Sequence, residues 1–294
     1  MANETTPIVR QVYPMQEPPY VSEVIACGYW GIIALLRDDP TRVFKFCSPG
    51  RLDAVGYIER EKRMLKIVGS HPFIISPHWV NERGLCFDYY PMGDLRKYYE
   101  NLRPEIPPLT DRIRWCRETV CGVAYLHSKE IAHSDICARN ILLSPTRNVK
   151  ICDFGFSTTF GEDTVSHGPE TRYFRPQNVF SPKKDCLTKT KILDDLFSLG
   201  SVFYELLSGH MPYPGVDEYE VWKLYEEHVF PQLDDIRPQG FAELIRKCWN
   251  EEYISISALQ SDLDDVTWDP SLEMTNGVDG THPKVPQYPE FSLI

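Results

Sequence analysis

The sequence His-Ser-Asp-Ile-Cys-Ala-Arg-Asn at residues 133–140 is followed downstream by Asp-Phe-Gly at residues 153–155. Asp135 is a candidate for orienting a hydroxyl nucleophile, and Asn140 and Asp153 offer oxygen ligands of the kind that magnesium prefers. The two aspartates are 153 − 135 = 18 residues apart, which leaves room for a short hairpin between them. Each motif alone is weak, but the ordered pair indicates a metal-assisted site that acts on a hydroxyl group.

The composition of the chain is that of an ordinary globular protein. Its 294 residues are 42% hydrophobic and 25% charged, enough for one large domain or two lobes with substantial cores. The net charge of −11 disfavours a nucleic-acid partner, because phosphate-backbone binding relies on clustered Lys and Arg. Nine cysteines without a Cys-x-x-Cys pair indicate a reducing compartment rather than disulfides or a zinc site. No stretch suits a signal sequence or a membrane span, so we expect an intracellular protein, cytoplasmic or nuclear, with no membrane partner.

Two terminal segments differ in composition from the rest of the chain. Residues 1–19 and 269–294 are rich in proline and are predicted to be flexible. The spacing Pro-x-x-Pro-x-x-Pro at residues 283–289 could dock into an SH3-type groove, although plain disorder is the simpler interpretation. Residues 20–268 between them are the expected folded domain.

The first part of that domain is rich in strand-forming residues. The pattern predicts a hairpin over residues 21–34 and a short strand over residues 42–46. Because side chains alternate along a strand, Lys45 shares one face with Val43. An ammonium group on an inner strand face requires an anionic partner.

The helix predicted from about Asp53 to Val68 supplies that partner. Glu61 follows Ile58 by three residues and therefore lies on the apolar, inward face of the helix. Glu59 has basic residues at the matching spacings and points more toward water. The pattern therefore selects Glu61 as the partner of Lys45.

Helical patterns dominate the second part of the domain. Apolar residues recur at helical spacing from Ile113 to Ala124, with Thr110 as the expected N-cap. From Asp194 to Ser208 the sequence is apolar nearly all round and is followed by Gly209. This pattern predicts a central buried helix.

With these motifs, the sequence resembles the eukaryotic protein kinases over roughly residues 20–268. The resemblance implies an α+β, two-lobed protein-kinase fold, with an antiparallel β-sheet N-terminal lobe that carries one helix (about 20–88) and a mainly α-helical C-terminal lobe (about 91–268). It also implies ATP and Mg2+ as cofactors and a protein as substrate. Asp135 corresponds to the catalytic base, and Asn140 and Asp153 to the magnesium ligands.

Residues nearer the N-terminus match the nucleotide-binding positions of that family. Lys45 corresponds to the lysine that contacts the α- and β-phosphates, held by Glu61. Ala26 stands where the family has the first glycine of its phosphate loop. The other matched positions are the loop residues Gly28, Gly31 and Ile33, the adenine contacts Val43 and Leu142, the gatekeeper Phe87 and the hinge residues Asp88 and Tyr90.

Two indicators of acceptor specificity disagree. Arg139, four positions after Asp135, stands where tyrosine kinases carry an arginine. Thr171, in the segment of residues 170–177, stands where Ser/Thr kinases carry a threonine. Because that segment faces the substrate, the resemblance favours Ser/Thr over Tyr.

Several positions depart from the family pattern, while Asp195 matches the aspartate that braces the catalytic loop. Ser134 replaces the arginine that receives an activation-loop phosphate, so we expect no activation by phosphorylation there. Gln177 replaces a glutamate whose arginine partner is also missing from residues 253–257. The joint absence avoids an unpaired buried charge and indicates coordinated remodelling.

Three functional hypotheses remain open from the sequence. The first is an active protein kinase, from a divergent family such as those of fungi. The second is a pseudokinase that acts as an interaction module, supported by the departures from the family pattern. The third is a small-molecule phosphotransferase, which the segment around Thr171 and the Cys-Trp pair at residues 248–249 argue against.

Overall fold

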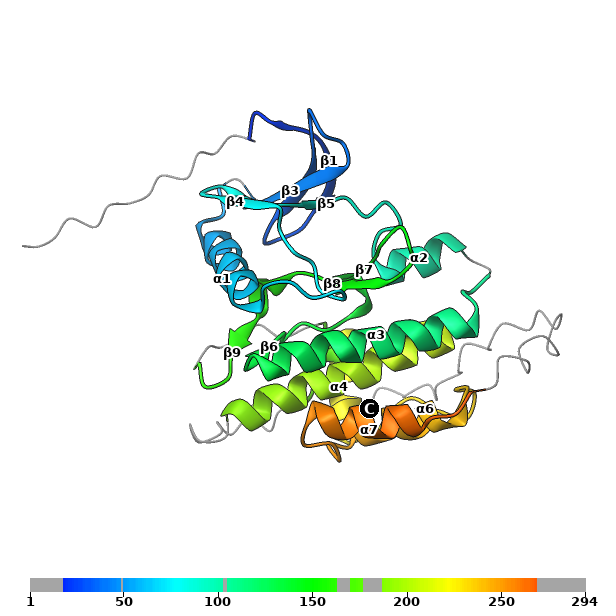
Figure 1. The fold of residues 1–294 in the computed structure, drawn as a ribbon. Coiled ribbons are helices and arrows are strands. Elements are labelled where there is room, and N and C mark those ends of the chain that lie inside the picture. Colours follow the sequence, from blue (N-terminus) through cyan, green and yellow to red (C-terminus); the bar gives the residue numbers. More distant parts are fainter. Residues whose placement is uncertain (1–17, 49, 103–104, 163–169, 177–186, 269–294) are drawn as a thin grey trace, which may run out of the picture. The chain divides into compact units, whose positions relative to one another are not determined.

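A computed structural model describes residues 18–268, apart from 49, 103–104, 163–169 and 177–186 (Figure 1). The predictions for Gln177, for the proline-rich tail with its SH3-type partner, and for all but the last two residues of the N-terminal segment lie outside the described residues. The chain divides into two compact units. Of the described residues, the first unit contains those between 18 and 62 and between 77 and 89, and the second contains those between 63 and 76 and between 90 and 268.

The first unit is built on an antiparallel sheet with the strand order β1-β2-β3-β5-β4. The predicted hairpin and the strand after it are both present. The strands are β1 (Val21–Cys27), β2 (Ile32–Leu36), β3 (Arg42–Phe46), β4 (Trp79–Asn81) and β5 (Gly84–Asp88).

One face of this sheet packs into an aromatic core. Phe44 and Phe46 are buried there together with Ala34 and Cys86. The backbones of β3 and β5 approach so closely that a Cβ atom on Gly84 would lie 2.0 Å from the carbonyl oxygen of Lys45. A glycine is therefore required opposite the strand that carries the predicted phosphate-binding lysine.

The helix α1 (Leu52–Val68) follows the sheet strands β1–β3 in sequence. It begins within one residue of the predicted start and ends at the predicted Gly69, which has φ of +71°. The Gly69 amide donates to the carbonyl oxygen of Leu65 at 3.0 Å. This left-handed glycine closes the helix as expected of a C-terminal cap.

The second unit is mainly helical (Figure 1). Its short strands form two-residue and three-residue ladders, β6 with β9 and β7 with β8. These strands are β6 (Ile131–Ala132), β7 (Ile141–Leu143), β8 (Val149–Ile151) and β9 (Thr158–Thr159). The helices are α2 (Leu95–Leu102), α3 (Leu109–Ser128), α4 (Leu187–Ser208), α5 (Glu218–Glu226), α6 (Gln239–Trp249) and α7 (Ile256–Asp265).

Helix α4 is the buried central helix that the sequence predicts. It runs beside α3 (Figure 1) and packs against α6. A Cβ atom on Gly200 would lie 2.7 Å from Cβ of Cys248, so a small residue is needed where the two helices cross. The indole of Trp249 donates from Nε1 to the hydroxyl of Ser201 at 3.0 Å. The Cys-Trp pair thus fixes α6 on α4.

The N-cap predicted for α3 is wrong. The helix begins at Leu109, and Thr110 lies within its first turn. The residue before the helix is Pro108, whose carbonyl oxygen accepts from the amides of Asp111 at 3.0 Å and Arg112 at 3.1 Å. Since proline has a fixed φ and needs no amide partner at a helix start, it precedes the first turn without a side-chain cap.

These elements confirm the predicted α+β class, with a strand-rich N-terminal part and a mainly helical C-terminal part. Residues 63–76, which the sequence analysis places in the N-terminal lobe, belong to the second unit. Among the described residues, no helix is both long and apolar enough to cross a bilayer.

Candidate active site

The loop at residues 133–140 is held from below by Asp195 of α4. The Asp195 carboxylate is fully buried and accepts the backbone amides of His133 at 2.9 Å and Ser134 at 2.8 Å. It also contacts Nε2 of His127 in α3 at 2.9 Å. These contacts confirm the bracing predicted for Asp195. They hold Ser134 at φ of +64°, a conformation that a non-glycine residue adopts only at a cost.

His133 joins this loop to the Asp-Phe-Gly segment. Its ring packs edge-on against Phe154, with ring centroids 4.9 Å apart, as the sequence analysis expects. Nε2 donates to the carbonyl oxygen of Cys152 at 3.0 Å, which leaves Nδ1 to accept the Asp135 amide at 3.3 Å. His133 is fully buried and is therefore a structural link between the two motifs.

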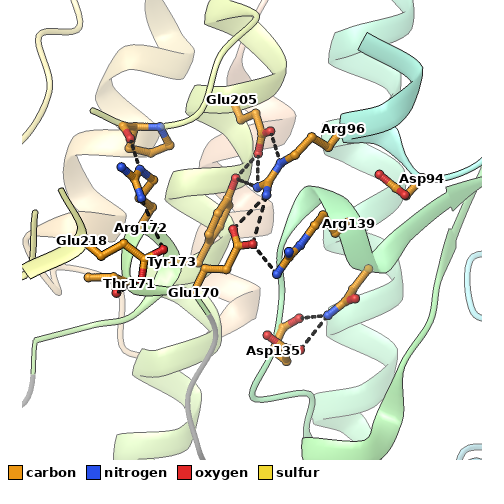
Figure 2. Close-up of polar contacts among 12 residues, drawn as sticks. Asp94, Arg96, Asp135, Arg139, Glu170, Thr171, Arg172, Tyr173, Glu205 and Glu218 are labelled. Atoms are coloured by element: carbon orange, nitrogen blue, oxygen red, sulfur yellow. Dashed lines mark hydrogen bonds and ion pairs between the residues drawn. The ribbon is translucent and has the colours of Figure 1, made fainter. Parts of the chain in front are cut away.

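Asp135 lies in this loop (Figure 2) and is held by Asn140 at the end of the loop. The Asn140 amide nitrogen donates to the backbone oxygen and to a carboxylate oxygen of Asp135, both at 2.8 Å. Burial and the nearby Asp153 carboxylate raise the pKa of Asp135 to about 8, against the opposing effects of Asn140 and Arg139. A carboxylate with a raised pKa is suited to accept a proton.

The same residues offer the oxygen atoms that a magnesium ion requires. Because both amide hydrogens of Asn140 can be used on Asp135, the side-chain oxygen is left as the donor atom for a cation. Asp153 has φ of +64° and lies close enough to Asp135 to raise its pKa. Two neighbouring carboxylates with an amide oxygen fit a hard divalent cation that keeps water and phosphate ligands.

Arg139 forms an ion pair with Glu170 (Figure 2). Glu170 also accepts from Arg96 of α2 at 2.9 and 3.2 Å. Arg96 in turn donates to Glu205 of α4 at 2.9 Å and to the Tyr173 hydroxyl at 2.7 Å. We call these five residues the arginine–glutamate cluster.

The arginine–glutamate cluster is balanced in charge, and its members other than Arg139 are buried or half-buried. Burial alone would lower the pKa of Arg96, but the surrounding Tyr173, Glu205 and Glu170 raise it above its usual value. The cluster joins α2, α4, the loop at residues 133–140 and the segment that starts at Glu170. The sequence analysis did not identify Glu170, Arg96 or Glu205, because no local spacing connects them.

The segment after Glu170 has its own polar contacts. The Thr171 hydroxyl donates to Glu218 of α5 at 3.3 Å. Arg172 is buried and donates to the carbonyl oxygens of Pro212 at 3.0 Å and Tyr213 at 3.3 Å. The segment is therefore fixed to the second unit by side chains on each of residues 170–173.

In the first unit, the predicted ion pair is present. Nζ of Lys45 lies 2.7 Å from Oε2 of Glu61, and the two side chains are 12% and 2% exposed. Glu59 is half exposed and pairs with Lys62 at 2.6 Å, as its helical position predicts. Strand alternation and helix periodicity together identified the correct glutamate.

The remaining predicted nucleotide-site residues are divided between the two units. Ala26, Gly28, Gly31, Ile33, Val43, Phe87 and Asp88 belong to the first unit, and Tyr90 and Leu142 to the second. In the first unit, Val43 and Phe87 are buried partners across β3 and β5. The amide of Gly28 donates to the carbonyl oxygen of Gly31 at 2.9 Å and closes the β1–β2 turn. The roles of these residues toward a nucleotide stay predictions.

A further buried arginine, Arg175, was missed by the sequence analysis. Its Nε lies 2.7 Å from Asp194 of α4 and its Nη1 lies 3.2 Å from Glu251, just after α6. Burial alone would lower the pKa of Arg175, but these two carboxylates raise it above its usual value. The signal available in the sequence was a cation next to the altered proline motif at residues 176–177.

Comparison with known proteins places these motifs in a family. A family model described as protein tyrosine and serine/threonine kinase matches residues 45–259. Similar human proteins are the tyrosine-protein kinase FRK, 28% identical over 71% of the chain, and the cAMP-dependent protein kinase catalytic subunit PRKX, 33% identical over 69%. The dual specificity protein kinase pyk3 of Dictyostelium discoideum is 29% identical over 65%. The chain spans 42%, 56% and 14% of the lengths of these relatives, respectively.

Proposed function

Because the chain belongs to the protein tyrosine and serine/threonine kinase family, we propose that it is an active, magnesium-dependent enzyme that transfers the γ-phosphate of ATP to Ser or Thr hydroxyls of proteins. The arrangement of Asp135 and Asn140 is the observation that carries the proposal. The half-buried Asp135 carboxylate, whose pKa is raised, lies in a loop whose backbone amides donate to Asp195.

In the proposed reaction, Asp135 orients the acceptor hydroxyl and accepts its proton. The hydroxyl oxygen forms a bond to the γ-phosphorus, the bond between that phosphorus and the β–γ bridging oxygen breaks, and ADP leaves. Asn140 and Asp153 would hold magnesium, which supplies charge neutralisation on the phosphates. Lys45, kept in place by Glu61, is the proposed cation that contacts the α- and β-phosphates.

Two observations favour an aliphatic hydroxyl as the acceptor. Thr171 occupies the position at which Ser/Thr kinases carry a threonine. Arg139, the feature that resembles tyrosine kinases, is engaged by Glu170. The relatives of this chain include tyrosine, serine/threonine and dual specificity kinases. Whether it phosphorylates Ser and Thr or Tyr is therefore decided by experiment.

The test is phosphosite mapping by mass spectrometry after incubation with ATP, magnesium and a mixed peptide library. The wild type and Asp135→Asn are compared, with Asp264→Asn on the exposed face of α7 as a matched control. We expect phosphate on Ser and Thr with the wild type and the control. Asp135→Asn should transfer at least a hundred-fold less phosphate, since a catalytic base typically raises the reaction rate by a factor of about 10²–10⁴. Omission of magnesium is expected to abolish transfer.

Transfer to Tyr alone would overturn the Ser/Thr assignment but leave the kinase assignment intact. Equal transfer by the wild type and Asp135→Asn would overturn the role of Asp135. Transfer to small-molecule acceptors alone would indicate a small-molecule phosphotransferase. Absence of all transfer would indicate the pseudokinase hypothesis.

A further inference from the structure

Arg139 is the exposed member of the arginine–glutamate cluster. Its side chain is 55% exposed, whereas those of Arg96 and Glu205 are 11% and 8% exposed. Glu170, at 20% exposed, lies between the two arginines and contacts both (Figure 2). Glu205 already balances the charge of Arg96, so the negative charge of Glu170 is what balances Arg139.

The position of this ion pair makes its charge relevant to the acceptor. Arg139 lies in the same loop as the proposed catalytic Asp135, four residues after it, and its ion pair with Glu170 joins that loop to the segment that carries Thr171. The segment after Glu170 holds two other arginines. Arg172 is 9% exposed and bound to backbone carbonyl oxygens, with Glu218 at 3.7 Å. Arg175 is 10% exposed and paired with Asp194 and Glu251. Among the arginines described in this loop and segment, Arg139 is therefore the exposed one, whose pairing state an approaching peptide would meet.

We propose that Glu170 determines substrate specificity by holding the charge of Arg139 in an ion pair. The site then accepts peptides with neutral or basic side chains next to the acceptor and discriminates against acidic or phosphorylated ones. This inference rests on the proposed kinase function and names its substrate class. The physical reason is that a guanidinium released beside the acceptor would attract an anionic neighbour, whereas a paired one does not.

The test uses two synthetic peptides that differ only in the residues on either side of the acceptor serine, glutamine in one and glutamate in the other. The measured quantity is the ratio of kcat/KM for the glutamine peptide to that for the glutamate peptide. We expect the wild type to favour the glutamine peptide. In Glu170→Gln the ratio should fall by about two- to five-fold, the range of one exposed charge pair.

Two further variants separate the ion pair from a general effect of charge. Glu218→Gln removes one negative charge from a neighbouring, 66% exposed position that contacts Thr171 and Arg172 rather than Arg139. It should change the ratio by less than about two-fold. The double variant Arg139→Gln with Glu170→Gln removes both partners and should return the ratio toward that of the wild type. An unchanged ratio in Glu170→Gln, or an equal change in Glu218→Gln, would overturn the proposal.

The outcome remains decisive if the kinase proposal fails or if a variant does not fold. Should the wild type transfer no phosphate to either peptide, the same ratio is taken from the dissociation constants of fluorescently labelled peptides without nucleotide. Should Glu170→Gln not fold, Arg139→Gln leaves the Glu170 carboxylate without this partner. That variant should reject the glutamate peptide more strongly than the wild type does, and no such increase would overturn the proposal.

Discussion

Arg175 lies between two acidic side chains. In the family pattern, the corresponding ion pair has the negative charge on this segment and the positive charge after the Cys-Trp pair. The family pattern has a glutamate two positions later and an arginine after the Cys-Trp pair. Here the cation is Arg175, 10% exposed, and the anions are Asp194 and Glu251. An ion pair thus joins the segment of residues 170–176 to the end of α6, with the positive charge on the segment and the negative charge after the helix. The remodelling inferred from the missing residues includes a replacement contact.

Replacement of Arg175 by Gln is expected to lower the free energy of unfolding by about 1.5–3 kcal/mol, because the half-buried Asp194 loses its charged hydrogen-bond partner. Burial already raises the pKa of Asp194 to about 6, although Arg175 opposes this effect. The matched control is Arg246→Gln, whose partners Glu243 and Glu252 are exposed, and it should cost less than about 1 kcal/mol. Chemical denaturation measures both values. Equal losses would mean that Arg175 has no special structural role.

Among single residues, the sequence predicts contacts that local periodicity determines. Lys45 and Glu61 could be matched because a strand and a helix each present one face. Arg175 and Glu251 are 76 positions apart and lie in segments without periodicity. Arg139 and Glu170 are joined only when the chain folds the segment back onto the catalytic loop. No local pattern could have identified these pairs.

At the scale of elements, the β1–β2 turn is fastened to α1 by aromatic side chains. Trp30 stacks on Tyr57 with ring centroids 3.7 Å apart and an interplanar angle of 27°. The Arg51 guanidinium lies 3.4 Å from the ring centroid of Tyr29. We call these four residues the aromatic clasp. It connects the predicted phosphate loop with the helix that carries Glu61.

Trp30→Ala is expected to raise the KM for ATP by roughly two- to ten-fold, since an aromatic pair contributes about 0.5–1.5 kcal/mol. Without the contact of Trp30 with Tyr57, the β1–β2 turn is less ordered before ATP binds. Part of the binding free energy of ATP is then used to order this turn. The KM for peptide should change much less. Trp30→Phe keeps a ring for stacking and should restore most of the ATP affinity. Steady-state kinetics with each substrate varied in turn measures the effect, and an unchanged KM for ATP would contradict a role for the clasp.

The segment after the Asp-Phe-Gly motif is fixed by a carboxylate. The Glu162 carboxylate accepts hydrogen bonds from the backbone amide of Thr159 at 3.0 Å and from Nη2 of Arg63 at 3.1 Å. Burial alone would raise the pKa of Glu162, but these hydrogen bonds hold it below its usual value. Ser157 is fully buried, and its hydroxyl donates to the carbonyl oxygen of His133 at 3.0 Å. Glu162 thus supplies a negative charge that fixes this segment through Arg63 and Thr159 without a phosphate.

We therefore expect phosphatase-treated and untreated protein to have equal activity. Glu162→Gln should lower activity several-fold in both preparations, because the segment loses its ion pair with Arg63. Glu243→Gln, which alters an exposed pair on α6, is the matched control and should have no effect. A large loss of activity on dephosphorylation of the wild type would show that a phosphate, and not Glu162, orders the segment.

At the scale of the whole molecule, the sequence predicts the class and order of the elements better than their grouping. Alternating and helical patterns identified the strands of the sheet, α1 and α4. They could not show that residues 63–76 belong with the second unit. That grouping depends on non-local contacts, such as the stacking of His71 on Tyr125 at 4.4 Å and the bond from the Tyr125 hydroxyl to Val68 at 2.8 Å.

The net charge of −11 acts on every approaching substrate, independently of the local pairing of Arg139. A negative protein attracts a basic peptide over distances of about one Debye length, which shrinks as salt is added. We expect the KM of a basic peptide substrate to rise several-fold between about 20 and 200 mM NaCl, while that of a matched neutral peptide changes little. Glu170→Gln should alter the preference at each salt concentration but leave the slope with salt nearly unchanged, since it removes one charge of eleven. Equal salt dependence for the two peptides would mean that contacts near the acceptor alone decide which substrates bind.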